Sequence, residues 1–241
     1  IRKLVSFGTR HTLSDTKSNT RGIGAARRWI EAEFNKISKA CGGCLQVITQ
    51  KQVISGEKRI PDPVEVVNVI AILKGQTDPS RYVVMSGDID SRVSDPLDFT
   101  SDSPGANDNA SGMAGVIEAA RVLSKYQFNG SIVFAGLSGE EQGLFGGKIL
   151  AKYAQDHNWR VHGVLNNDMI GNSTGINGVT DNTTARIFSE GTRVIETKEQ
   201  ADKLCKLGCF NHQGFFYSKP LNAQKFELWL TEFNQNNIQK E

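Results

Sequence analysis

An apolar run over residues 131–137 ends at a Ser-Gly-Glu-Glu sequence and gives way to a helical pattern. The β-branched and aromatic residues in this run indicate a buried strand. A buried strand that turns directly into a helix is typical of an α/β sheet, whose chemistry lies beyond the carboxyl ends of its strands. The run therefore places Glu140 and Glu141 where a functional site is expected.

Two interpretations of this glutamate pair are possible. Adjacent glutamates on a turn diverge, so that one can ligate a metal while the other faces the water that the metal activates. Acidic residues are also favoured at helix N-termini by the helix dipole, and an isolated Glu-Glu pair fits that simpler explanation. The rest of the sequence favours the first interpretation.

Three further acidic residues stand at similar positions. Asp88 and Asp168 each follow an apolar run, and Asp108 is expected in the first turn of a helix over residues 106–126. Four acidic clusters should therefore converge on one edge of the sheet. Because carboxylates brought this close raise one another's pKa, such a cluster requires cations.

The order and spacing of these motifs resemble the zinc exopeptidases that include bacterial leucyl aminopeptidase, aminopeptidase Y and glutamate carboxypeptidase II. The resemblance extends from about residue 64 to residue 171. It implies that Asp108 bridges two zinc ions and that Glu140 is the general base. It also implies that Glu141 ligates one zinc ion and Asp168 the other, and that the peptide bond after Asp108 is cis.

Asp88 departs from the family pattern. Most relatives carry a His at this position, held by an acid that corresponds to Asp90. We expect Asp88 to be a metal ligand and Asp90 to support it from behind. This all-oxygen set should let harder ions such as Mn²⁺ compete better against Zn²⁺.

The last ligand of the family is a second departure. It is a His near the carboxyl end, whereas the only downstream His of this chain, His212, stands in a different context. We expect His212 to be a surface or tail residue, and the chain to stop or diverge before its final ligand and to hold at most one metal tightly. His11, in a polar loop, should be hydrogen-bonded rather than a ligand.

The fold class implied is α/β, a three-layer α/β/α sandwich around a mixed, mostly parallel sheet. With 241 residues, 38% of them hydrophobic, one domain with a sizeable core suffices. We assign residues 1–209 to the catalytic domain and residues 210–241 to a divergent tail of that domain. Strands are predicted at 44–54, 64–73, 81–86, 131–137, 161–165 and 184–188, and helices at 21–38, capped by Thr20, and at 106–126, 143–157 and 197–207.

Charge and cysteine content limit the partners and the compartment. The 28 Lys and Arg residues balance 26 Asp and Glu and are scattered, which disfavours a nucleic-acid surface, and no apolar run reaches the length of a membrane span. A short-loop disulfide between Cys41 and Cys44 is favoured over a zinc knuckle shared with Cys205 and Cys209. Since relatives are mostly exported, we expect a periplasmic or secreted protein, with a leader or another segment upstream of Ile1.

The resemblance implies that the protein removes the N-terminal residue of a peptide substrate through metal-activated water. Two other functions remain open. Glutaminyl cyclases share these motifs with a single zinc ion, and family members without metal are non-catalytic binding modules. The retained acids favour an enzyme, whereas Asp88 and the missing His favour the binding module.

Overall fold

The computed structural model of the chain describes residues 1–175 and 177–183. The chain divides into two compact units, residues 1–172 and residues 173–241. In the second unit, the described residues include an isolated bridge between Thr174 and Thr180. The helices and strands described below all belong to the first unit. Several predictions lie outside the described residues, namely the strand at 184–188, the helix at 197–207, the tail at 210–241, Cys205, Cys209 and His212.

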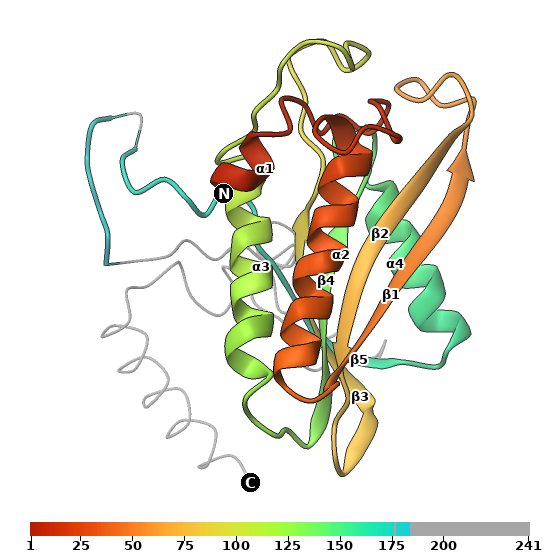
Figure 1. Cartoon of the computed structure of the whole chain (residues 1–241), viewed down its shortest axis with the longest axis vertical. Coiled ribbons are helices and arrows are strands. Elements are labelled where there is room, and N and C mark those ends of the chain that lie inside the picture. The colour runs from red at the N-terminus through yellow and green to blue at the C-terminus, as the bar shows by residue number, and fades with distance from the viewer. Residues whose placement is uncertain (176, 184–241) are drawn as a thin grey trace, which may run out of the picture. The chain divides into compact units, whose positions relative to one another are not determined.

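A mixed five-stranded sheet forms the middle layer of the first unit, in the order β1-β2-β4-β3-β5 (Figure 1). The β1–β2 and β2–β4 pairs are antiparallel, and β3 is parallel to both β4 and β5. The mixed sheet predicted from the sequence is therefore confirmed. Its strands are β1 (Leu45–Ile54), β2 (Val64–Leu73), β3 (Asp78–Asp88), β4 (Gly130–Leu137) and β5 (Arg160–Asn166).

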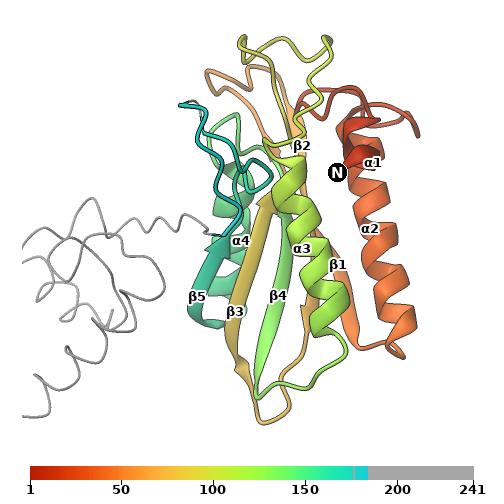
Figure 2. The same ribbon diagram turned by 90° about the vertical axis from the view of Figure 1, so that its left-hand side faces the viewer.

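Helices cover both faces of the sheet (Figures 1 and 2). The helices α2 (Gly22–Ala40) and α3 (Ala110–Leu123) lie on one face with the short α1 (Arg2–Val5), and α4 (Phe145–Asp156) lies on the other. Because side chains alternate along a strand, Ala71 and Phe134 are buried in the core with α2 and α3, while the adjacent Ile70 and Val133 are buried with Leu150 of α4. These two cores give the predicted α/β/α sandwich.

The start of α2 differs from the prediction that Thr20 caps it. The residue at the N-cap is Arg21, whose side chain makes no capping hydrogen bond. Instead, the hydroxyl of Ser14 accepts a hydrogen bond from the backbone N–H of Ile23 at 2.9 Å. A residue nine positions upstream therefore satisfies the helix start, which local spacing could not indicate.

The end of α2 bears out the predicted short-loop disulfide. Cys41 and Cys44 are bonded to each other, which ties the end of α2 to the start of β1. None of the helices in residues 1–175 and 177–183 is long and apolar enough to cross a membrane.

Candidate functional site

The predicted acids lie at one edge of the sheet. Asp88 ends β3 and pairs in register with Leu137, the last residue of β4, so the loop with Glu140 and Glu141 begins beside it. The neighbouring β5 runs parallel to β3 and ends two residues before Asp168. The carboxyl ends of three parallel strands thus bring four acids to one edge.

Asn109 connects the segment of Asp108 to its neighbours. The bond between Asp108 and Asn109 is cis, as the resemblance implied. Asn109 is the N-cap of α3 and accepts a hydrogen bond from the backbone N–H of Gly112 at 3.0 Å. Asp108 was predicted to lie in the first turn of this helix, but it precedes the helix. The amide of Asn109 donates to Asp88 Oδ2 at 3.2 Å and to the carbonyl of Asn167 at 2.8 Å. One side chain thereby joins the segments that follow β3 and β5.

Asp90 holds the loop that follows β4. Its side chain is buried, with 1% of its surface exposed. The two carboxylate oxygens accept four hydrogen bonds, from the backbone N–H groups of Gly139, Glu140 and Glu141 at 3.0, 3.3 and 3.2 Å and from the hydroxyl of Thr12 at 3.0 Å. Asp90 was expected to support Asp88, but none of the hydrogen bonds among the described residues joins the two. Its hydrogen bonds instead fix the backbone of the glutamate loop.

Arg10 joins the end of β3 to the Asp108 segment, and no sequence motif indicated this role. Its buried guanidinium donates to the backbone carbonyl of Ile89 at 2.8 Å and to those of Pro104 and Gly105 at 2.7 and 3.0 Å. Burial lowers the pKa of Arg10 to about 10, although the negative charges of Asp90 and Asp108 act to raise it. The guanidinium therefore faces both acid-bearing segments.

His11 is hydrogen-bonded, as expected of it. Its Nδ1 accepts a hydrogen bond from the backbone N–H of Leu13 at 3.1 Å, and its Nε2 lies 3.1 Å from the carbonyl oxygen of Pro96. Since Nδ1 accepts, Nε2 carries the proton and donates to that carbonyl. Only Nδ1 is thus engaged by the loop of His11 itself. Nε2 contacts Pro96, in the segment that follows β3, and lies 3.2 Å from the side-chain amide of Gln142, the residue after Glu141.

Glu141 is paired with a cation of the chain. Arg92 Nε donates to Glu141 Oε2 at 2.5 Å, and both side chains are partly buried. Arg59 donates to the backbone carbonyl of Glu141 at 2.6 Å. Because Arg92 pairs with Oε2, Oε1 is the oxygen of Glu141 that remains for a metal ion.

The acids at this edge raise one another's pKa. Burial and then the charges of Asp90 and Glu140 raise the pKa of Asp88 to about 8. Burial and then the charges of Asp90 and other acids raise the pKa of Glu140 to about 7. The pKa of Asp168 is raised by burial and by Asp108. These carboxyl groups therefore lie within electrostatic reach of one another.

This donor set suits a divalent cation in its chemistry, since its negative charges are poorly balanced and cations prefer carboxylate oxygens. The side-chain positions fit less well. Within residues 1–175 and 177–183, no three His, Cys, Asp or Glu side chains gather closely enough to hold a metal ion. The charge of a metal site is thus present at this edge, but its coordination shell is not formed.

The raised pKa of Asp88 predicts how the stability of the metal-free protein depends on pH. Between its ordinary pKa of 3.8 and its folded value of about 8, the folded state retains a proton that the unfolded state has lost. The free energy of unfolding should therefore fall as pH rises through this window. Thermal melts in a chelator at about pH 5.5 and pH 8 measure this, and Asp88→Asn should reduce the fall. Equal melting temperatures for the native chain would contradict the prediction.

The chain is similar in sequence to one protein family and to several curated proteins. Residues 68–206 match the family model described as "Peptidase family M28". A "Probable zinc metalloprotease" of Leptosphaeria maculans is 46% identical over 208 residues, which cover 86% of this chain and 48% of that protein. Another "Probable zinc metalloprotease", from Pyrenophora tritici-repentis, is 48% identical over 201 residues, which cover 83% of this chain and 42% of that protein. The chain spans about half the length of the curated relatives it matches.

Solved structures share the fold at low sequence identity. LapB from Legionella pneumophila is 21% identical with a TM-score of 0.51, over 70% of this chain and 41% of LapB. A Zn-dependent exopeptidase from Parabacteroides distasonis is 21% identical with a TM-score of 0.54, over 72% of this chain and 61% of the exopeptidase. A glutaminyl cyclase from an Acidobacteriales bacterium is 23% identical with a TM-score of 0.54, over 70% of this chain and 56% of the cyclase. These likenesses support the fold alone.

Proposed function

The chain belongs to peptidase family M28, and from that premise we propose that the protein is a zinc-dependent aminopeptidase, which hydrolyses the N-terminal peptide bond of its substrates. The observation that carries the proposal is the position of Glu140. Its backbone is fixed by Asp90 at the carboxyl end of β4, and the charges of Asp90, Glu141, Asp168 and Asp108 act on its carboxyl group. The names of the metalloprotease relatives agree with this assignment.

Four acids would hold the metal in this proposal, namely Asp88, Asp108, Glu141 and Asp168. When bound, zinc supplies a Lewis acid that lowers the pKa of water and polarises a carbonyl group. Glu141 would offer Oε1 to the metal, because Arg92 pairs with Oε2. The number of ions is part of the proposal, and we expect at most one to bind tightly.

Glu140 is the proposed general base. Its raised pKa of about 7 in the metal-free chain lies near neutrality, where a carboxyl group can both accept and donate a proton. It takes the proton of the attacking water and returns it to the leaving amine. The Asp90 hydrogen bonds hold the backbone of this residue and so limit where its side chain can reach.

A glutaminyl cyclase activity is the second candidate, because glutaminyl cyclases are among the structures that share the fold. Two assays on the whole protein separate the candidates. Release of a free N-terminal amino acid from a peptide is the expected result. Formation of pyroglutamate from a peptide with N-terminal Gln, without such release, would replace the aminopeptidase proposal, and neither reaction in the metal-loaded protein would favour a binding module.

We also propose that the protein is periplasmic or secreted. The disulfide between Cys41 and Cys44 supports this, since disulfides persist mainly in oxidising compartments. Fractionation of the producing cells tests it, and recovery of the protein only from the cytosol would contradict it.

Asp88→His should shift the metal preference of the protein toward Zn²⁺. The carboxylate at this position favours harder ions such as Mn²⁺, whereas imidazole suits zinc better. Competition between the two ions, followed by metal analysis of the native protein and the variant, measures the shift. An unchanged preference would mean that Asp88 does not touch the metal.

A further inference from the structure

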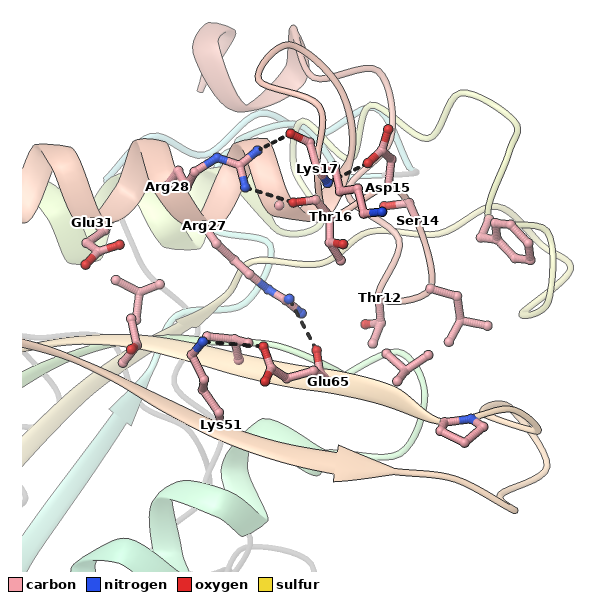
Figure 3. Close-up of a pocket in the computed structure, with 18 residues that line it drawn as sticks. Thr12, Ser14, Asp15, Thr16, Lys17, Arg27, Arg28, Glu31, Lys51 and Glu65 are labelled. Atoms are coloured by element: carbon pink, nitrogen blue, oxygen red, sulfur yellow. Dashed lines mark hydrogen bonds and ion pairs between the residues drawn. The ribbon is translucent and has the colours of Figure 1, made fainter.

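A recess beside α2 is lined in part by Thr12, whose hydroxyl donates to Asp90. It is a cavity of about 910 Å³ between α2, the loop of residues 12–17 and the strands β1 and β2 (Figure 3). Among its described lining residues there is none of the proposed metal ligands, and Glu140 does not line it either. Its charged lining residues are Lys17, Arg27, Arg28 and Lys51 with Asp15, Glu31 and Glu65. The cavity thus carries one more positive than negative side chain.

Arg27 enters this cavity from α2 and extends toward Glu65 of β2 (Figure 3). Only 7% of its surface is exposed. Its one hydrogen bond among the described residues is a long one, from Nη1 to the backbone carbonyl of Glu65 at 3.3 Å. Nε and Nη2 are buried and have no hydrogen-bond partner in the described part of the chain. Since buried polar groups are nearly always hydrogen-bonded, this guanidinium lacks the partners that its burial requires.

The acids near Arg27 are engaged elsewhere. The Glu65 carboxylate pairs with Lys51 at 3.5 Å. The charge of Asp90 acts on Arg27, but the oxygens of Asp90 accept hydrogen bonds from Thr12 and three backbone N–H groups. Arg28, the next residue, is satisfied by backbone carbonyls such as that of Thr16 at 2.8 Å. The charges of Asp90 and Glu65 both act on Arg27, but no ion pair among the described residues joins Arg27 to either acid.

We propose that this cavity binds a small oxyanion, a carboxylate or a phosphate, with Arg27 as its main contact. The planar guanidinium presents N–H donors in the geometry that both groups accept. The ligand would displace the long bond to the Glu65 carbonyl, and the side chains of Leu13 and Val64 in the lining would contact the rest of an organic acid. The volume lies in the range of small-molecule sites. The proposal does not depend on the peptidase reaction.

Isothermal titration of the protein with inorganic phosphate, and separately with N-acetylglutamate, tests the proposal. We expect at least one probe to bind, and Arg27→Met to weaken that binding at least about tenfold. Arg27→Lys should weaken it less, because it keeps the charge but loses the planar pair of donors. Arg121→Met is the matched control, since it removes one exposed arginine that is paired with Glu118 on the surface.

The probes also distinguish the sources of the anion. Binding of N-acetylglutamate alone identifies a carboxylate site, and binding of phosphate alone a phosphate site. The absence of binding of either probe up to about 10 mM would overturn the proposal, because such weak binding has no specificity. Equal loss in Arg27→Met and Arg121→Met would also overturn it. If Arg27→Met does not fold, Arg27→Lys decides, and unchanged binding in that folded variant counts against Arg27.

Discussion

Glu140→Gln should lower turnover by at least about a thousandfold and leave the metal content of the protein nearly unchanged. An amide has nearly the same shape as a carboxyl group but does not accept the proton of the attacking water. The hydrogen bond to Asp90 is made by the backbone N–H of residue 140, so the substitution retains it. The loop should therefore keep its position while the base is lost. Initial rates of amino-acid release, with metal analysis of the same preparation, measure both effects.

Glu141→Gln is the matched control for this experiment. It changes the adjacent residue in the same way, but Glu141 is proposed as a ligand, so the expected loss is of metal. It also removes the ion pair with Arg92. Loss of metal in Glu140→Gln with retention in Glu141→Gln would show that the two roles are reversed. Full turnover in Glu140→Gln would exclude it as the base.

The strands β2 and β4 were predictable because each is a mainly apolar run bounded by turn-forming or polar residues, whereas β1 alternates apolar and polar residues. Residues 131–137 were predicted as a strand, and β4 spans Gly130–Leu137. Residues 64–73 coincide with β2. The start of α2 was harder to predict, because the partner of one of its first N–H groups comes from outside the helix. Ser14 satisfies α2 from nine residues upstream, and no pattern within the helix itself indicates that contact.

The acids of the candidate site could be predicted because they follow strands that were themselves predictable. Asp88 and the Glu140 loop follow parallel strands, and parallel strands bring their carboxyl ends to one edge. The side chains that organise this edge could not be predicted. Arg10 contacts carbonyls 79 to 95 residues away in the sequence, and Asn109 reaches Asp88 across 21 residues. Such contacts depend on tertiary packing, and a lone Arg or Asn in a sequence does not reveal them.

Asp90→Asn should cost more stability than any other single substitution considered for this site, about 3–5 kcal/mol in the free energy of unfolding. Two effects combine. The new amide N–H₂ would face donors, since each oxygen of Asp90 accepts hydrogen bonds from N–H or O–H groups. The negative charge that acts on the buried cations Arg10 and Arg27 would also be lost. Urea unfolding of the native chain and the variant measures the difference.

Two variants separate these effects from a general loss of charge. Thr12→Val removes a single hydrogen bond to Asp90 and should cost about 1 kcal/mol. Asp62→Asn removes an exposed carboxylate and should leave the free energy of unfolding unchanged. If Asp90→Asn cost no more than Thr12→Val, Asp90 would not be what holds the Glu140 loop. In the expected case, the folded fraction of Asp90→Asn should also turn over more slowly at saturating substrate, because its base sits on a loop that has lost one or two of its three backbone hydrogen bonds to residue 90.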